Sequence, residues 1–478
     1  MSQLVIIATI VGYIALLFIV AWRSSRGSGA LSFFTGGRNT PRVVAAIAMV
    51  GAAMSGVTYT SVPGTVAADS FSYLQTTLGF FVGYIIIAYI LIPIYYRLGV
   101  VSLYEYLDQR FGVVAHRTGA WFFLLSKVLS ASLRAYIICV VLQEFIYDHY
   151  NLPFALNAVV MMALVWLYTF RGGVKSVVWV EMVKTIIMCA SIVVAIVAIV
   201  KALGLDLSGA VSAVLDSSYS DTLFFDNPLD RRYFWKQFVA GIFLVVAMTG
   251  LDQDMMQTIL SCRSRRDAQR SLMTSIVIQV VVIALFLSLG ALLYLFADAH
   301  GLAESGDTLF GYVAMECGLP MVVGLLFLLG LVASTYSSAG SALTALTTSF
   351  TLDILGAKGD DVVKKRKVSH LGIAVVMAIV IIAFDAFSSQ GAITLIFTMA
   401  SYTYGPLLGM FAFGLFSRRE VRGWAVPVVA LVAPLLSYVV AHNSEAWLCG
   451  YQFSYEVILL NAAITILGFW AVSRRAAA

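Results

Sequence analysis

The dominant feature of this sequence is a succession of apolar runs of about 20 residues, separated by short charged or Gly- and Pro-containing segments. Such a run is the length that an α-helix needs to cross a lipid bilayer. Thirteen runs can be counted, at 3–22, 43–66, 75–97, 118–147, 153–170, 176–203, 236–258, 271–297, 320–350, 370–386, 391–416, 423–441 and 455–473. The chain is 61% hydrophobic and 12% charged, where a soluble domain has about 25% charge. We therefore expect an all-α polytopic membrane protein, and we exclude a soluble enzyme, a disordered chain and a nucleic-acid-binding module.

The distribution of basic residues predicts the orientation of these runs. If the N-terminus is extracytoplasmic, 23 of the 30 Lys and Arg residues fall in cytoplasmic segments, four fall in extracytoplasmic ones and three fall within runs. Basic residues are retained on the cytoplasmic side of membrane proteins. We expect a cell (inner) membrane protein with its C-terminus in the cytoplasm. No obligate protein partner is evident from the sequence.

Two of the runs contain interruptions that lipid does not tolerate. Small residues between Gly51 and Gly56 interrupt run 43–66, and Thr249 to Asp254 interrupt run 236–258. Broken helices are found where they line a cavity, and transporters use them to bind ions and solutes. Each break lies in the first helix of a five-helix half, and the two helices run in opposite directions, as an inverted repeat requires. The predicted organisation is 1–42 leader helix and loop, 43–203 first repeat, 204–235 extracytoplasmic loop, 236–417 second repeat and 418–478 two C-terminal helices.

Run 320–350 carries a polar face. Ser334, Ser337, Ser338 and Ser341 are spaced three or four residues apart and share one side of a helix. Neutral oxygens suit a monovalent cation such as sodium, whereas calcium or magnesium would need more carboxylates. The alternative is a packing face whose hydroxyls bond to their own helix.

Several segments, taken in order, resemble the sodium:solute symporter family, which includes sodium–glucose, proline and sialic acid symporters. The resemblance spans nearly the whole chain, and its motifs lie at 102–112, 172–177, 250–257, 337–353 and 404–406. It implies a LeuT-like five-plus-five inverted repeat and sodium-coupled import of a small solute by alternating access.

The resemblance also implies sodium ligands. The main site would use the carbonyls of Gly51, Met54 and Ser334 with the hydroxyls of Ser337 and Ser338. A second sodium site would use Glu181 with Ser337 and Ser341. Lys184 follows Glu181 by one turn, so the alternative is that these two side chains neutralise each other.

Arg134 is the most informative residue for the solute. An arginine near the centre of a membrane helix costs roughly 2.5–3.5 kcal/mol, so it should face the interior and an anion. It would clamp a substrate carboxylate, or pair internally with Glu181 or Glu144. A sialic acid symporter of the family is similar in placing an arginine on this helix. The candidate substrate-binding residues are Ser55, Thr58, Tyr73, Thr77, Arg134, Met248, Gln253, Ser401 and Tyr402. We expect a carboxylate-bearing solute such as sialic acid; the alternative is a neutral sugar, amino acid or vitamin.

A sodium channel is the alternative from another class of membrane protein. It would conduct without substrate, and composition does not distinguish it from a symporter. We expect no enzyme, because all five histidines fall in segments between runs or near run ends.

The remaining charged residues and the cysteines have structural explanations. We expect Lys127 to extend toward the cytoplasmic surface, and Asp252 and Asp254 to cap their helix or pair with the basic cluster 263–270. The five cysteines are expected to be unpaired, with a Cys317–Cys449 disulfide as the alternative.

Overall fold

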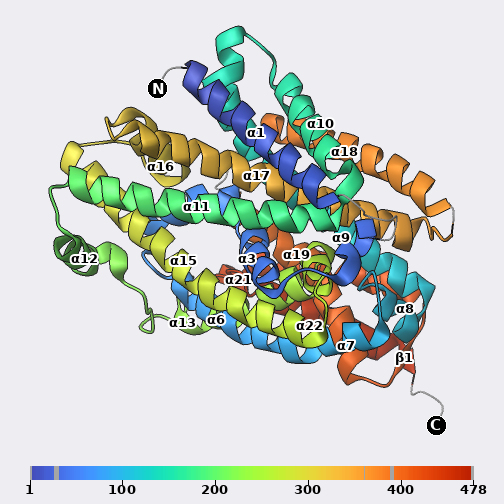
Figure 1. Ribbon diagram of the computed structural model, residues 1–478. Helices are drawn as coiled ribbons and strands as arrows, with labels where there is room; N and C mark the ends of the chain where they lie inside the picture. Colours follow the sequence, from blue (N-terminus) through green and yellow to red (C-terminus); the bar gives the residue numbers. More distant parts are fainter. Residues whose placement is uncertain (1–2, 26–31, 360, 388–391, 475–478) are drawn as a thin grey trace.

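The computed structural model describes residues 3–25, 32–359, 361–387 and 392–474. Its first half begins with a leader helix and continues through the first predicted repeat (Figure 1). The elements are α1 (Gln3–Ser25), α2 (Ser32–Thr35), η1 (Gly36–Arg38), α3 (Arg42–Ala53), α4 (Gly56–Gly64), α5 (Val66–Asp69), α6 (Tyr73–Ile86), η2 (Ile87–Leu91), α7 (Ile92–Leu98), α8 (Glu105–Phe111), α9 (Val113–Leu142), η3 (Gln143–Tyr147), η4 (Asp148–Tyr150), α10 (Phe154–Gly172) and α11 (Val174–Ala202).

The second half repeats the pattern of a broken helix followed by long helices. Its elements are α12 (Leu207–Leu215), η5 (Ser218–Ser220), α13 (Phe234–Val245), η6 (Val246–Gly250), α14 (Gln253–Leu260), α15 (Arg265–His300), η7 (Gly306–Thr308), α16 (Leu309–Glu316), α17 (Met321–Ser349), η8 (Phe350–Ile354), α18 (Asp361–Phe387) and α19 (Ala392–Phe416). The C-terminal part contains β1 (Glu420–Val421), α20 (Ala425–His442), α21 (Ser444–Trp447), α22 (Val457–Val472) and β2 (Ser473–Arg474), and the two short strands pair antiparallel.

Each predicted apolar run overlaps at least one helix. Within the described residues, nine helices are long and apolar enough to cross a membrane, and counting each of two bent pairs as one span gives up to eleven. The α22 helix is apolar but has only 16 residues, and α19 begins directly after residues outside the described part. The predicted number of thirteen is therefore not confirmed, although the helical membrane fold is.

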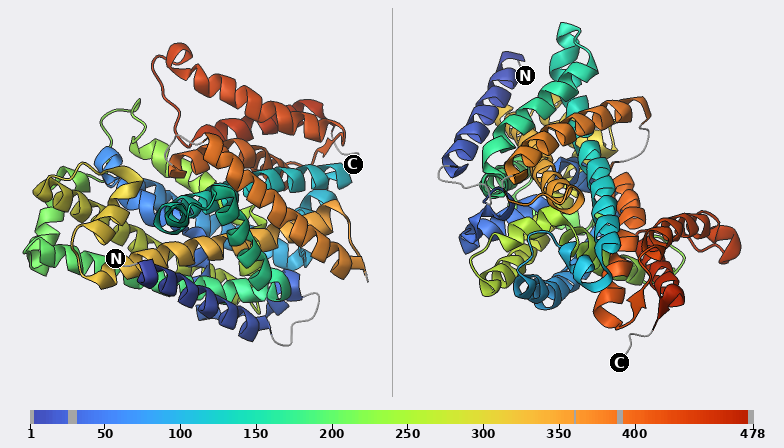
Figure 2. Two further views of the ribbon diagram at one scale, coloured as in Figure 1. Left: turned by 90° about the horizontal axis from the view of Figure 1, so that it is seen from above. Right: turned by 90° about the vertical axis from the view of Figure 1, so that its right-hand side faces the viewer.

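The leader helix and the C-terminal helices lie on opposite flanks of the bundle (Figure 2). The α1 helix packs against α10, α11 and α17, whereas α20 and α22 pack against α19. The broken α3–α4 pair lies in the interior, where α11 and α15 contact α3 and α17 contacts α4. Long helices from both halves thus surround the interrupted ones, which is where an irregular backbone can be satisfied away from lipid.

The five cysteines are all free. Cys139 and Cys262 are buried, and Cys317 and Cys449, for which a disulfide was the alternative, do not pair. The prediction of unpaired thiols is confirmed.

Candidate functional site

Both predicted helix breaks are present. The α3 and α4 helices meet at an angle of 58°, and α13–η6 and α14 meet at 68°. At the first break Met54 and Ser55 have extended backbones, with φ of −110° and −117°, and at the second Asp252 is extended with φ of −99°. The helical hydrogen-bond pattern stops at these residues, so backbone polar groups become available to a bound ion or solute.

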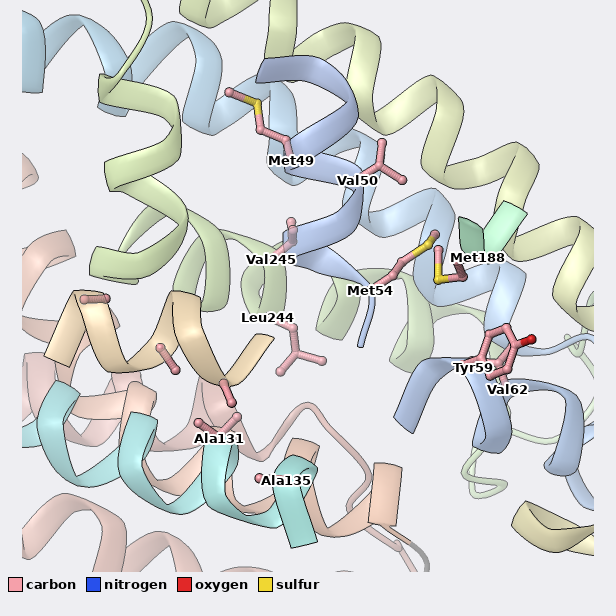
Figure 3. Packing of buried hydrophobic residues seen from close by; sticks show 14 of the residues in the cluster. Met49, Val50, Met54, Tyr59, Val62, Ala131, Ala135, Met188, Leu244 and Val245 are labelled. Carbon is pink, nitrogen blue, oxygen red and sulfur yellow. The ribbon is translucent and has the colours of Figure 1, made fainter. Parts of the chain in front are cut away.

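Two glycines allow the first helix break to pack closely against the neighbouring helices. A Cβ atom on Gly51 would overlap Thr185 Oγ1 and lie 2.8 Å from the Glu181 carboxylate, and one on Gly56 would lie 2.6 Å from Thr335 Oγ1. Any larger side chain would push α3 away from α11, or α4 away from α17. The side chain of Met54 points toward Met188 of α11, as Figure 3 shows, and seals the break on that side with apolar contact.

The α17 helix, which carries the predicted serine face, contacts α3, α4 and α14, the helices beside the two breaks. Within the described part of the chain, the Ser334 and Ser337 hydroxyls are buried and have no hydrogen-bond partner. Ser338 accepts a hydrogen bond from Lys184 Nζ at 3.3 Å, and Ser341 donates to Asp254. Buried hydroxyls are normally bonded, so these two oxygens are available to a ligand.

Glu181 and Lys184 form a buried ion pair one helical turn apart. Lys184 Nζ lies 2.7 Å from Glu181 Oε2, and both side chains are 0% exposed. The Glu181 carboxylate also lies beside Ser337, but neither of its oxygens receives a well-aligned hydrogen bond. The ion pair that was the stated alternative is present, and Ser341, the third residue of the predicted second sodium site, donates a hydrogen bond to Asp254. The second sodium site stays a prediction.

Lys127 of α9 does not extend to the surface, so that prediction was wrong. Its ammonium lies 2.7 Å from Asp254 Oδ2 and 3.1 Å from Asp252 Oδ2, and Tyr404 of α19 donates to Asp252 at 2.5 Å. We call Lys127, Asp252, Asp254, Ser341 and Tyr404 the Lys127 network. A buried lysine needs such partners because desolvation of an unpaired charge is costly. Asp252 also caps α14, accepting from the Asp254 and Met255 amides, as predicted; the basic cluster 263–270 is not its partner.

A cavity of about 90 Å³ lies between the two broken helices and α9. Arg134 of α9 lines it, and the buried Nε atom of Arg134 has no hydrogen-bond partner among the described residues. No described carboxylate lies within ion-pair distance of Arg134, since Glu181 is taken by Lys184 and the two aspartates by Lys127. The Glu144 side chain lies outside the described residues. The guanidinium is thus a cation that lines a cavity, and the lining also includes Phe80, Tyr84, Val245 and Met248.

The other predicted substrate residues divide into three groups. Ser55, Thr58, Tyr73 and Met248 line the cavity together with Arg134. Ser401 and Tyr402 line a separate, larger cavity of about 370 Å³ that also contains Asp69, Arg231 and residues of the 452–457 segment. Thr77 and Gln253 line neither of these two cavities. Thr77 bonds to the Tyr73 carbonyl, and the Gln253 amide bonds to the backbone of Val101 and Leu103.

The two cavities share Tyr73 and Phe397, whose rings are stacked with centroids 6.5 Å apart. This pair is a partition between the larger cavity and the smaller one. Sequence reasoning missed Phe397, Lys127 and Asp252 as lining residues. For the two charged residues a signal was present, since a charge inside an apolar run needs a partner.

Comparison with known proteins identifies the family. Residues 33–426 match the model of the sodium:solute symporter family. The chain belongs to the sodium:solute symporter family. It is therefore a sodium-coupled secondary transporter that works by alternating access, and the expected coupling ion is confirmed at this level.

Individual relatives agree with this assignment. The chain is similar to the sodium/sialic acid symporter of Proteus mirabilis, with 23% identity over 96% of this chain and 93% of that protein. It is 26% identical to the human sodium-coupled monocarboxylate transporter 1 over 80% of this chain, which covers 64% of that protein, less than two thirds of its length. A substrate-bound, outward-open structure of a sodium-coupled sialic acid symporter has the same fold, with a TM-score of 0.82, 17% identity and 99% coverage of both chains.

Proposed function

We propose that this symporter imports a small organic solute carrying a carboxylate and that Arg134 binds that carboxylate. The observation that carries the proposal is the position of the Arg134 guanidinium, which lines the cavity and whose buried Nε atom has no partner in the described part of the chain. Guanidinium groups bind carboxylates through paired, charge-assisted hydrogen bonds. Two relatives with different anionic substrates in their names, sialic acid and monocarboxylates, agree with a shared anion clamp.

The surroundings of Arg134 favour an incoming anion over an internal one. Lys127 contacts both neighbouring aspartates directly, so among the described residues that line the cavity Arg134 is a cation without a carboxylate in ion-pair contact. Ser55 and Thr58 would add hydroxyls, and Met248 with Val245 would contact the carbon skeleton. An apolar cavity of about 150 Å³ accommodates benzene, so a cavity of about 90 Å³ favours a short carboxylate in this conformation. A nine-carbon sugar acid would require the cavity to widen.

For sodium, we propose the ligand set Gly51, Met54, Ser334, Ser337 and Ser338. The support is the meeting of an interrupted α3–α4 backbone with two buried, unpartnered serine hydroxyls of α17. The donor set consists of neutral oxygens, which suits a monovalent cation. We also propose that the chain lies in the cell membrane with its N-terminus outside, supported by the 23-to-4 distribution of basic residues.

The test is sodium-dependent uptake in proteoliposomes with lactate, pyruvate, sialic acid and glucose as probes. We expect uptake of at least one carboxylate and none of glucose. Arg134→Ala should lower that uptake by about 10- to 100-fold, because a hydrogen bond to a charged group contributes about 1.5–3 kcal/mol. Arg171→Ala, which removes an exposed arginine from the end of α10, is the matched control and should leave uptake unchanged. Full uptake by Arg134→Ala, or uptake of glucose alone, would overturn the carboxylate assignment.

A further inference from the structure

Lys184 places a cation inside the proposed sodium site. Its Nζ atom lies 2.7 Å from Glu181 Oε2 and 3.3 Å from the hydroxyl oxygen of Ser338, and the side chain is completely buried. Ser338 is one of the proposed sodium ligands. The nearby backbone of Gly51, another proposed ligand, is so close to Glu181 that a Cβ there would lie 2.8 Å from the carboxylate. The ammonium group and the proposed sodium position therefore share one oxygen, the Ser338 hydroxyl, and Glu181 lies beside both.

The charges around Lys184 come from several helices. Glu181, on its own helix, is the carboxylate in direct contact. Asp254 of α14 and Arg134 of α9 are the next charged groups, while Tyr13 of α1 and Tyr168 of α10 face Glu181. From α17 the site receives hydroxyls and no charge. The contact pair therefore consists of one carboxylate and one ammonium, and its two charges balance in the absence of sodium.

Sodium and this ammonium compete for the site. Two monovalent cations a few ångströms apart repel strongly in a buried environment, and a single carboxylate cannot balance both. A serine oxygen that accepts a hydrogen bond from an ammonium also has less electron density to offer a metal ion. We propose that Lys184 is a tethered cation that alternates with sodium: its ammonium lies on Ser338 when sodium is absent and withdraws from Ser338 when sodium binds. This proposal rests on the sodium ligand set given above.

Such a residue has two consequences for transport. It lowers the affinity for sodium, because sodium binding must include displacement of the ammonium. It also keeps Glu181 neutralised after sodium has left, so that the empty transporter carries no unpaired buried charge while it returns to face the outside. Lys184 therefore favours sodium release and the return step.

The test is sodium binding to the purified full-length protein without substrate, followed by intrinsic tryptophan fluorescence or thermal stabilisation, with choline chloride as the ionic-strength control. Lys184→Gln should bind sodium about tenfold more tightly, because the competing charge is gone. Lys184→Arg, which keeps a permanent charge, should bind it no more tightly than the natural chain. Lys201→Gln, at the exposed end of the same helix, is the matched control and should bind sodium unchanged.

A second measurement separates release from binding. In proteoliposomes, Lys184→Gln should slow net uptake, which needs the empty return, while substrate exchange at saturating sodium on both sides is preserved. If Lys184→Gln does not fold, the double variant Glu181→Gln with Lys184→Gln removes both charges together and should still bind sodium more tightly than the natural chain.

The outcomes are distinguishable. If the natural chain binds sodium and the folded neutral variants bind it with equal or lower affinity, the tethered-cation proposal is wrong and the sodium-coupled function stands. If the natural chain shows no response to sodium, the proposed sodium ligand set is wrong, and the tethered-cation proposal, which depends on it, is wrong too. Loss of carboxylate uptake alone affects neither result, because this assay contains no substrate.

Discussion

Lys127 Nζ lies 2.7 Å from Asp254 Oδ2, which joins α9 to the segment that follows the second helix break. The same ammonium contacts Asp252, the cap of α14, and through Asp252 it is connected to Tyr404 of α19. Elements from both halves of the chain therefore meet at one buried lysine. The Lys127 network fixes the position of the second break, and Arg134 lies two turns further along α9.

We expect Lys127→Met to destabilise the protein by about 3–5 kcal/mol, because it leaves two buried aspartates without their cation. The measurement is the melting temperature of the purified protein in detergent. Adding Asp254→Asn to Lys127→Met should recover part of the loss, since it removes one of the unpaired charges. Lys201→Met, at an exposed position of α11, is the control and should have the same melting temperature as the natural chain. An unchanged melting temperature for Lys127→Met would refute the stabilising role of the Lys127 network.

Gly51→Ala should disturb the first helix break. Its new Cβ would overlap Thr185 Oγ1 and lie 2.8 Å from the Glu181 backbone and carboxylate, so α3 must move away from α11. We expect a loss of about 1–3 kcal/mol in stability, as for overpacked interiors, together with weaker sodium binding. Gly372→Ala is the matched control, because its Cβ would meet no atom within 4 Å. If both variants have the same melting temperature and sodium affinity, the close approach at Gly51 is not required.

Ser337→Ala should weaken sodium binding by about tenfold or more while leaving the melting temperature nearly unchanged without sodium. The hydroxyl is buried and none of the described residues forms a hydrogen bond with it, so its removal costs the sodium-free protein little. Ser369→Ala removes a hydroxyl of the same kind from α18 and should leave sodium binding as it is. The measurement is a sodium titration of the natural chain, Ser337→Ala and Ser369→Ala. Equal sodium affinities of the three proteins would remove Ser337 from the ligand set.

The stacked pair Tyr73–Phe397 should control access to the smaller cavity. In a background without native cysteines, a cysteine introduced at Thr58 should react with a small water-soluble thiol reagent several-fold faster when Phe397 is replaced by Ala. Phe453→Ala, which changes the larger cavity only, is the control and should not change the rate. An unchanged rate in Phe397→Ala would show that the partition lies elsewhere.

The sequence was sufficient to predict the two helix breaks and the residues of the serine face. Glycines and polar residues in the middle of an apolar run weaken the helix at that point, and serines three or four residues apart share a side of any helix. The breaks are confirmed by the extended backbones of Met54, Ser55 and Asp252. Three residues of the serine face, Ser334, Ser337 and Ser341, are buried in α17, and the hydroxyls of Ser334 and Ser337 have no partner among the residues that the structure describes.

The partners of the buried charges were harder to predict. Glu181 and Lys184 are one turn apart on one helix, so their pairing was a stated alternative and was found. Lys127 and Asp254 are separated by more than 100 positions, and periodicity within a helix does not say which helix it faces. The placement of Gln253 depends on the rotation of α14 after a 68° bend, which turns its amide to the backbone of Val101 and Leu103. The number of spans also could not be fixed by counting runs.

The buried ion pair within one helix and the buried ion pairs between helices have different consequences for membrane insertion during synthesis. The α11 helix contains both Glu181 and Lys184, so it can leave the translocation machinery as an electrically balanced segment. The α9 helix carries Lys127 without its own counterions, and Asp252 and Asp254 are synthesised more than 100 residues later. At a cost of roughly 2.5–3.5 kcal/mol per central charge, α9 is a poor candidate for early release into lipid. We therefore expect α9 to insert stably into the bilayer only after α14 has been synthesised. Assembly of the first half of the protein would then depend on the second half.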